Sequence, residues 1–220
     1  MKHVVITGAN RGIGLALACH YQGENWNVTG VCRESSLELE KVATQIIEGI
    51  DITQEDNVER LKTQLKGQNI DLLINNAGLL QDEVLGSINF DSLRLQMEIN
   101  AFAPLRVSES LLPNLHRGSK IANITSRMGS ISDNDSGGRY GYRASKAALN
   151  ALGRSLAIDL KEQGIAVAQL HPGYVKTRMV NFGGMITPEE SVAGLVRIIA
   201  NLNLENTGSF WHSNGEELPW

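Results

Sequence analysis

Short runs of β-branched and other apolar residues recur along the chain, and a helical pattern follows each of them. The runs cover residues 4–7, 28–31, 50–52, 72–74, 120–125 and 166–170. Strands that alternate with helices are connected by right-handed crossovers, which pair the strands in parallel and place helices on both faces of one sheet. A seventh strand is expected at 209–211, after a helix that Thr187 caps and that begins at Pro188. We therefore predict an α/β fold with a mostly parallel seven-stranded sheet.

No low-complexity linker and no fixed repeat divides the 220 residues. The prediction is a single doubly wound, Rossmann-like domain over residues 1–220 that binds a dinucleotide and carries out catalysis. The net charge of -4, without a basic stripe, argues against a nucleic-acid partner. Cys19 and Cys32 lack metal-ligand spacing, so no metal is expected. The N-terminal apolar run is too short for a signal or a membrane span, so we expect a cytoplasmic protein without a membrane partner.

A glycine-rich turn follows the first predicted strand and opens a helix. Its sequence, Thr7-Gly8-Ala9-Asn10-Arg11-Gly12-Ile13-Gly14, lets the backbone approach a pyrophosphate, and the helix N-terminus adds free N–H groups. The spacing G-x-x-x-G-x-G differs from the common G-x-G-x-x-G, and glycines also end strands for steric reasons. The placement between strand and helix favours the cofactor site. The candidate cofactor ligands here are Gly8, Asn10, Arg11, Gly12, Ile13 and Gly14.

The end of the second strand indicates which dinucleotide binds. An acidic residue there holds the ribose hydroxyls of NAD, whereas arginine pairs with the 2′-phosphate of NADP. Arg33 occupies this region, and Arg11 can approach the same phosphate from the glycine turn. NADP(H) is therefore favoured over NAD(H). Two alternatives stay open: Glu34 takes the hydroxyl role, or both arginines are simply solvated.

Tyr142 and Lys146 lie one helical turn apart at the start of a predicted helix, on the same face. A tyrosine with an ordinary pKa near 10 is a poor base, and a nearby cation favours its phenolate. The pair is thus a candidate for acid–base catalysis. The alternative, a packed tyrosine beside a surface lysine, is common in any protein.

Two further polar residues support the catalytic interpretation. Ser126 follows the strand at 120–125 and can orient a substrate oxygen toward Tyr142. Asn100, in a long helix predicted over 91–112, can hold a water that links Lys146 to solvent. The loop at 129–141 belongs to the ligand-binding end of the sheet.

Taken together, five separated motifs resemble the short-chain dehydrogenase/reductases: the turn 7–14, Asn75-Asn76-Ala77-Gly78, Asn100 with Ser126, Tyr142 with Lys146, and Pro172-Gly173 followed by Val175 and Thr177. Within that family, the short length, residues 126–131 and the ending 215–220 are similar to the C-factor and sniffer-type carbonyl reductase branch. The interval 127–141 is longer than in most relatives, with the excess at 133–138, so no substrate is assigned by analogy.

The resemblance implies roles for these residues. Tyr142 is the acid/base, Lys146 its partner and a ribose ligand, Ser126 the substrate anchor and Asn100 the relay. Cofactor contacts are implied for Asp51, Ile52, Asn75, Asn76, Ala77, Gly78, Tyr142, Lys146, Pro172, Gly173, Val175 and Thr177. Asp51 contacts the adenine, and Thr177 contacts the nicotinamide carboxamide. Relatives pair through their long central helices, which implies a homodimer or homotetramer.

The predicted function is hydride transfer between NADP(H) and a small carbonyl or alcohol substrate, with tyrosine acid/base catalysis. The first alternative is a dinucleotide-binding signalling or redox-sensing module whose output needs no turnover. Sugar-nucleotide epimerase chemistry is a weaker alternative, because residues 178–220 are too few for a substrate region of that class.

Three features outside the motifs complete the expectations. His171 is interpreted as a packing residue at a strand end. Asp82 and Glu83 are expected in a solvated loop. Met179, Phe182 and Met185 either line a lid over the substrate or contact the core.

Overall fold

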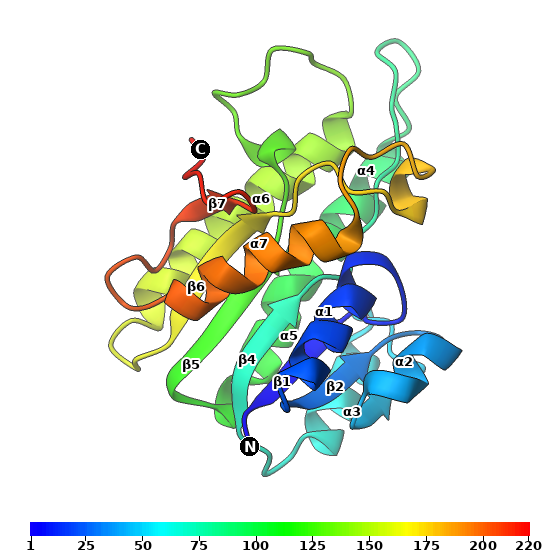
Figure 1. Ribbon diagram of the computed structural model, residues 1–220. Helices are drawn as coiled ribbons and strands as arrows, with labels where there is room; N and C mark the ends of the chain where they lie inside the picture. The colour runs from blue at the N-terminus through cyan, green and yellow to red at the C-terminus, as the bar shows by residue number, and fades with distance from the viewer.

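The computed structural model describes residues 1–220 and contains one sheet of seven strands in the order β3-β2-β1-β4-β5-β6-β7 (Figure 1). Every neighbouring pair is parallel. This confirms the predicted α/β class and doubly wound topology. The strands are β1 (His3–Thr7), β2 (Asn27–Val31), β3 (Gln45–Ile47), β4 (Ile70–Asn75), β5 (Leu115–Ile124), β6 (Ala166–His171) and β7 (Phe210–His212).

Helices cover both faces of the sheet because strand side chains alternate between them. Val4 and Ile6 of β1 pack in a core shared with α1 (Gly12–Gly23), α2 (Leu37–Val42) and α7 (Pro188–Asn201). Val5 packs in a second core on the opposite face, with α3 (Glu55–Gln64), α5 (Ala103–Ser110) and α6 (Tyr140–Asp159). In Figure 1, α1 and α7 lie in front of the sheet. None of the helices is long and apolar enough to cross a membrane.

The third strand is not where the sequence predicted it. It was expected at 50–52, but β3 is formed by Gln45–Ile47. Gly49, at φ +70, turns the chain after the strand. Ile50 and Ile52 are buried in the loop that follows, so their hydrophobicity reflects packing under the sheet rather than strand pairing.

The long helix predicted at 91–112 is interrupted. It consists of α4 (Phe90–Met97), a π-helical turn at Glu98–Phe102, and α5. Pro104 at the start of α5 has no N–H to donate to the carbonyl four residues earlier, which explains a local change of hydrogen bonding. Asn100 lies in this turn, so the interruption sets where its side chain points.

Other predicted ends are close to the observed ones. Thr187 and Glu190 form a capping box at the start of α7, as Thr187 and Pro188 predicted. The strand expected at 209–211 is β7, shifted by one residue, and the helix of Tyr142 begins two residues earlier, at Tyr140. Short 3₁₀ turns occur at Leu112–Asn114, Arg127–Gly129 and Arg178–Val180.

The chain runs outward from β1 through β2 to β3, and then returns to β4 on the other side of β1. The connections after β1 and β4 therefore leave the sheet in opposite directions. Such a switch point opens a crevice at the carboxyl ends of the strands, where ligands bind in open α/β sheets.

Candidate active site

The glycine turn and the segment after β4 meet at this switch point. Gly8 (φ +66) and Gly12 (φ +56) adopt backbone conformations that favour glycine. A methyl group on Gly8 would lie 3.0 Å from the Cα of Ala77, and one on Gly12 would lie 3.4 Å from Cγ2 of Thr177. Three segments that are distant in sequence are therefore brought together.

The N-terminus of α1 is open to an anion. Its N-cap residue, Arg11, makes no side-chain capping bond, so the first turn of the helix retains donors without a side-chain acceptor. A side chain at Gly14 would collide with the carbonyl oxygen of Gly8. Only glycine lets helix and turn approach this closely, which is the geometry expected of a phosphate cradle. Ile13 follows at the second position of α1.

The amide of Asn76 holds the glycine turn against the end of β4. Its Nδ2 donates to the carbonyl oxygens of Thr7 (2.9 Å) and Gly8 (3.1 Å). The side chain of Asn75 points instead into a buried amide network, where it donates to Asn123 (2.9 Å) and Ser108 (3.0 Å). Both side chains therefore form hydrogen bonds within the protein. The cofactor contacts predicted for Asn75 and Asn76 are accordingly expected from their backbone atoms.

Arg11 and Arg33 are exposed and form no ion pair. Asn10 ties the glycine turn to the end of β2, because its Nδ2 donates to the carbonyl oxygen of Glu34 at 2.8 Å. Both guanidinium groups are therefore free for an anionic ligand at this end of the crevice. Glu34 is exposed as well, so the NAD alternative is not removed by geometry alone.

The predicted adenine side lies beyond β3. Asp51 is half-buried, and its carboxylate accepts bonds from the backbone N–H (3.0 Å) and hydroxyl (2.8 Å) of Thr53. Ile52 beside it is buried, and its carbonyl oxygen accepts a bond from Arg106 at 3.3 Å. The Asp51 side chain is thus held in a fixed orientation.

Tyr142 and Lys146 lie on the same side of α6. The ammonium of Lys146 is 5.8 Å from the centre of the Tyr142 ring and donates to the carbonyl oxygen of Ile124 at 2.9 Å. Both side chains are buried, as is Ser126 at the end of β5. The proximity that the sequence predicted for the tyrosine–lysine pair is confirmed.

The titration of this pair differs from the expectation. Burial raises the pKa of Tyr142 above its ordinary value, although hydrogen bonding with Ser126 and the charge of Arg139 act in the opposite direction. Burial also lowers the pKa of Lys146 to about 7. The expected lowering of the phenol pKa by Lys146 is therefore not produced by the protein alone, because desolvation disfavours the charged form of both groups.

Asn100 is fully buried and connects three segments. Its side chain exchanges two bonds with the backbone of Leu79 (2.8 and 2.7 Å) and donates to Oγ of Ser145 at 2.9 Å. A methyl group on Gly78 would lie 3.3 Å from its Oδ1 and 3.8 Å from Nζ of Lys146. The structure thus places Asn100, Gly78 and Lys146 in one cluster.

The segment after β6 leads back to the glycine turn. The carbonyl oxygen of Pro172 accepts bonds from Ser191 (2.6 Å) and Ser213 (3.1 Å). Gly173 has φ +86 and lies against Ile186, with which Val175 forms an isolated bridge. The chain is thereby directed toward Thr177, beside the glycine turn.

Three apolar residues after Thr177 are exposed rather than packed in the core. The exposed fractions are 45% for Met179, 67% for Phe182 and 79% for Met185. Their exposure excludes a place in the hydrophobic core and leaves the lid interpretation.

His171 is buried and makes an edge-to-face contact with His212 at 4.7 Å between ring centres. Burial, assisted by His212, lowers the pKa of His171 to about 3. These observations agree with a neutral packing residue.

Glu83 is the residue that sequence reasoning misjudged. It was expected in a solvated loop, but it is buried, and its carboxylate accepts bonds from Gln96, Ser92 and the N–H of Gly141. Its neighbour Asp82 is exposed and pairs with Arg139 at 2.6 Å. No local pattern separates two adjacent acidic residues that meet partners distant in sequence.

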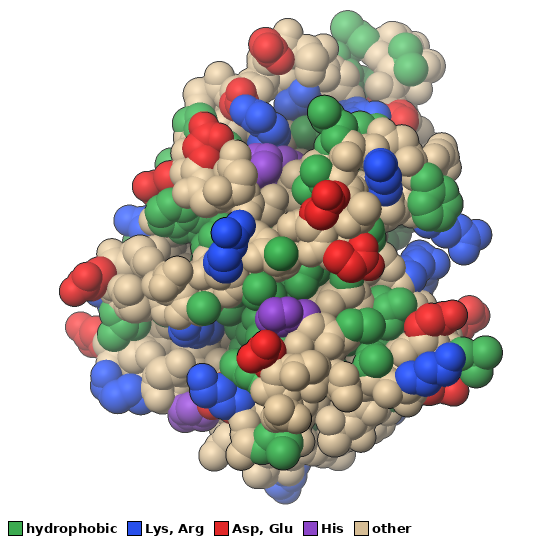
Figure 2. Space-filling model, in the orientation of Figure 1, with side chains coloured by type: hydrophobic (Ala, Val, Ile, Leu, Met, Phe, Trp, Pro, Cys, Tyr) green, Lys and Arg blue, Asp and Glu red, His purple; other side chains and the backbone are tan.

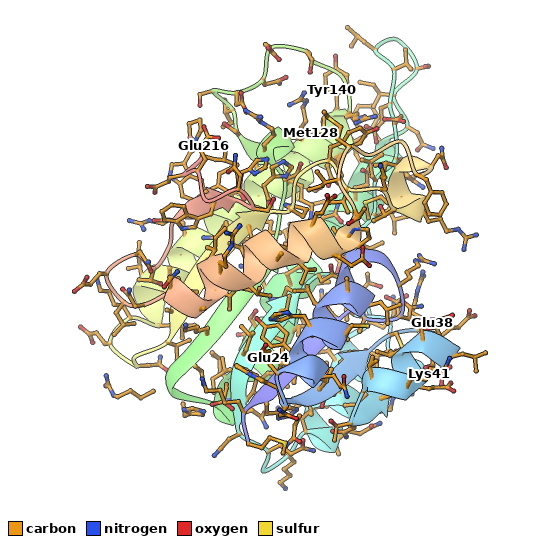
Figure 3. All side chains as sticks on the ribbon, in the orientation of Figure 1. Glu24, Glu38, Lys41, Met128, Tyr140 and Glu216 are labelled. Carbon is orange, nitrogen blue, oxygen red and sulfur yellow. The ribbon has the colours of Figure 1, made fainter.

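The long loop after Ser126 is held at several points. Arg127 pairs with Asp133 at 2.6 Å, and the backbone N–H groups of Ile131 and Ser132 donate to the carbonyl oxygen of Trp220, each at 3.1 Å. Met128 and Tyr140, which mark the two sides of this loop, lie at the same end of the molecule (Figure 3). The loop is therefore fastened at its base, next to the candidate active site.

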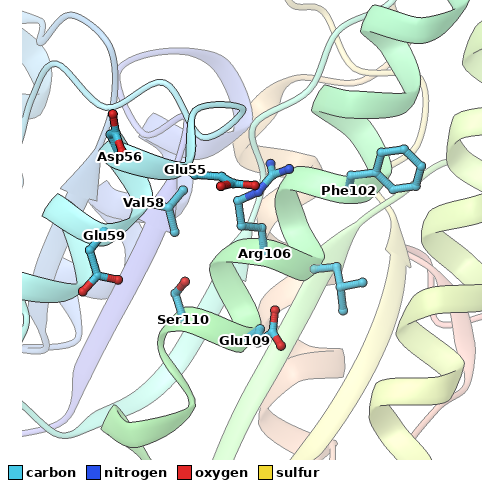
Figure 4. Close-up of a pocket in the computed structure, with 9 residues that line it drawn as sticks. Glu55, Asp56, Val58, Glu59, Phe102, Arg106, Glu109 and Ser110 are labelled. Atoms are coloured by element: carbon cyan, nitrogen blue, oxygen red, sulfur yellow. The ribbon is translucent and has the colours of Figure 1, made fainter.

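One hollow lies away from the glycine turn and Tyr142. A hollow of about 550 Å³ lies between α3 and α5, lined mainly by polar and acidic side chains such as Glu55, Glu59 and Glu109 (Figure 4). It contains none of the predicted site residues. Basic and acidic side chains are interspersed on the face drawn in Figure 2, which fits the absence of a basic stripe from the sequence.

Comparison with known proteins agrees with this geometry. The family model described as short chain dehydrogenase matches residues 2–183. The chain belongs to the short-chain dehydrogenase/reductase family, a family of oxidoreductases. It is 38% identical over 226 residues to 1-hydroxy-2-glutathionyl-2-methyl-3-butene dehydrogenase of Rhodococcus sp. (strain AD45), with 100% of both chains covered. It is 42% identical over 154 residues to C-signal of Myxococcus xanthus, which covers 69% of this chain and 93% of C-signal.

The solved structures that superpose on this chain include carbonyl reductases. The carbonyl reductase Sniffer of D. melanogaster superposes with a TM-score of 0.91 at 31% identity, covering 100% of both chains. The NADPH-bound carbonyl reductase from chicken fatty liver gives a TM-score of 0.88 at 30% identity, covering 100% of this chain and 99% of that one. The resemblance inferred from the sequence motifs is thereby confirmed.

Proposed function

We propose that this protein transfers a hydride between NADP(H) and a small carbonyl or alcohol substrate, with Tyr142 as the acid/base. The observation that carries the proposal is the clustering of Tyr142, Lys146 and Ser126 next to Gly78, in the segment that packs against the glycine turn. Residues 1–220 then act as one catalytic domain. Assembly as a homodimer or homotetramer is part of the same proposal.

The crevice fits a dinucleotide. Glycines stand where a side chain would collide at Gly8 and Gly14, and the uncapped start of α1 offers N–H groups to a pyrophosphate. The exposed Arg11 and Arg33 supply positive charge where a 2′-phosphate would lie. The NADPH-bound carbonyl reductase with the same fold supports the choice of NADP(H) over NAD(H).

When bound, the nicotinamide supplies or accepts the hydride. The hydroxyl of Ser126 binds the substrate oxygen and holds it beside Tyr142. During reduction, Tyr142 donates its proton to the oxygen on which negative charge develops. The raised pKa of Tyr142 keeps the phenol protonated and ready to donate. Lys146 and Asn100 hold the first turns of α6 in register with the crevice.

The test is a panel of aliphatic and aromatic aldehydes and ketones with NADPH or NADH, followed by loss of nicotinamide absorbance. The glutathionyl alcohol of the Rhodococcus relative is included with NADP⁺ in the oxidative direction. We expect turnover with NADPH that falls at least ~10³-fold in Tyr142→Phe, while NADPH binding is retained. Undiminished turnover in Tyr142→Phe would refute the tyrosine assignment, and a clear NADH preference would refute the arginine assignment.

The similarity to C-signal favours one second candidate, a dinucleotide-binding protein whose biological output needs no turnover. The same variant separates the two candidates. If the phenotype of a deletion strain is complemented equally well by wild type and by Tyr142→Phe, the binding role is supported; failure of Tyr142→Phe supports the enzyme.

A further inference from the structure

Glu83 is a buried carboxylate without a cation to neutralise it. It is 7% exposed, and its contacts are all neutral donors: Nε2 of Gln96 at 2.5 Å, Oγ of Ser92 at 3.0 Å and the backbone N–H of Gly141 at 3.1 Å. Burial of a carboxylate is costly unless its hydrogen bonds are satisfied. A buried carboxylate with three donors, two from α4 and one from α6, therefore indicates a specific role.

That role concerns the first turn of α6. The N-cap residue of α6, Arg139, has no side-chain capping bond and adopts a left-handed conformation (φ 50) that residues with a side chain rarely adopt. The carboxylate of Glu83 instead accepts from Gly141, the residue before Tyr142. A negative charge is favourable at this end of a helix. Glu83 thus supplies from a distant loop the cap that the local sequence lacks.

The packing around Gly141 shows that the contact is close. A methyl group on Gly141 would lie 2.8 Å from Oε1 of Glu83 and 2.6 Å from Nε2 of Gln96. The loop after β4 and the segment that leads into α6 lie side by side at the upper end of the molecule (Figure 1). The first turn of α6 therefore packs directly against the side chains of Glu83 and Gln96.

Gln96 extends this arrangement through α4. It is fully buried, donates to Glu83, and accepts from the backbone N–H of Gln81 at 3.0 Å. One turn later, Asn100 makes the equivalent link between Leu79 and Ser145 of α6. Two amide residues thus fasten the loop after β4 to α6, and Tyr142 lies between the points they hold.

We propose that Glu83 is a positioning residue for hydride transfer: by capping the first turn of α6 it fixes Tyr142 relative to Ser126 and Lys146. The proposal rests on the proposed function, because it assigns a task to Glu83 only if Tyr142 transfers the proton. It concerns the placement of the phenol for proton transfer, whereas the pyrophosphate cradle is built from other residues, in β1, α1 and the glycine turn.

The test uses hydrogen-bond complementarity. In Glu83→Gln, the new amide group faces either the N–H of Gly141 or the amide of Gln96, so two donors oppose each other. In the double variant Glu83→Gln with Gln96→Glu, position 83 accepts from Gly141 and donates to position 96, which still accepts from Gln81. Asp91→Asn is the matched control, because Asp91 is an exposed carboxylate on the same α4.

The measurements are kcat and KM for the carbonyl compound that the wild type reduces best, the Kd of NADPH by fluorescence, and the Tm of the cofactor-free protein. We expect kcat of Glu83→Gln to fall on the order of 10-fold to 100-fold, because small misplacements of a reacting group have effects of this size. NADPH Kd is expected to stay within about twofold, since the glycine turn is untouched. The double variant Glu83→Gln with Gln96→Glu, called the exchange variant below, is expected to recover most of kcat. Asp91→Asn is expected to match the wild type.

Each outcome decides the matter. An active wild type whose Glu83→Gln variant retains full kcat, even with a lower Tm, overturns the positioning role and leaves the proposed function intact. If Glu83→Gln does not fold, the exchange variant decides, and a folded exchange variant without recovered kcat overturns the role. A wild type that turns over no member of the panel overturns the proposed function, and this inference with it.

Discussion

The burial of the Lys146 ammonium allows the change in the free energy of unfolding on substitution to be predicted. Its Nζ is buried and has one acceptor, the carbonyl oxygen of Ile124 at 2.9 Å, although an ammonium carries three donors. Burial lowers its pKa from 10.5 to about 7. Lys146→Met shortens the unbranched side chain by one atom and removes the charged group that burial disfavours. We expect the variant to be more stable than the wild type in the absence of cofactor.

The magnitude follows from the pKa. A fall from 10.5 to about 7 corresponds to about 5 kcal/mol of destabilisation of the charged form, which is an upper limit. Loss of the bond to Ile124 opposes it by about 1 kcal/mol. A net gain of roughly 2–4 kcal/mol near pH 7 is expected, which raises Tm by roughly 4–16 °C for a chain of this size.

The pH dependence of stability tests the direction of this effect. Between pH 7 and 10.5 the unfolded chain binds the proton that folded Lys146 has released, so wild-type stability rises with pH across this window. The advantage of Lys146→Met should therefore be largest at or below pH 7 and shrink toward pH 10. The assay is thermal unfolding at pH 6, 8 and 9.5, with Lys161→Met, an exposed lysine, as control. A destabilised Lys146→Met, or an advantage that does not change with pH, would refute the reasoning.

Three further predictions follow from the described contacts. Gly14→Ala should weaken NADPH binding by more than ~10-fold in a fluorescence titration, because its methyl group collides with the carbonyl of Gly8; unchanged affinity would contradict the cradle. Arg33→Ser should raise the Kd of NADPH by ~10-fold or more and leave that of NADH nearly unchanged; equal losses would exclude a role in phosphate recognition. His171, whose pKa is lowered to about 3, should cost stability as pH falls below 6.5, by about 1.4 kcal/mol per pH unit. In His171→Phe this slope should be reduced, and an unchanged acid unfolding profile would assign it to other groups.

The fold could be predicted from the sequence because its signals are local. A β-branched run, a turn and an amphipathic helix recur in order, and Thr187 with Pro188 marks a helix start through its own backbone chemistry. The third strand was misplaced because Ile50 and Ile52 are buried without being paired. Hydrophobicity reports burial, and it does not distinguish a buried loop from a buried strand.

The part of the candidate site that depends on residue spacing within one helix could be predicted from the sequence. Four residues on a helix bring Lys146 beside Tyr142 whatever the rest of the chain does. Glu83 could not be found this way, since its partners Gln96 and Gly141 are neighbours only in the folded chain. The direction of the Tyr142 pKa was also beyond the sequence, because it depends on how completely the folded protein excludes water.

The π turn at Glu98–Phe102 has a consequence for how this protein tolerates insertions and deletions. One residue more or less rotates all that follows in a helix by about 100°. The extra residue in the turn lets Gln96 and Asn100 face α6 while Val107 still faces the sheet. Deleting a single residue here would turn either Gln96 and Asn100 away from α6 or Val107 away from the hydrophobic core. The length of this segment is therefore as constrained as its composition.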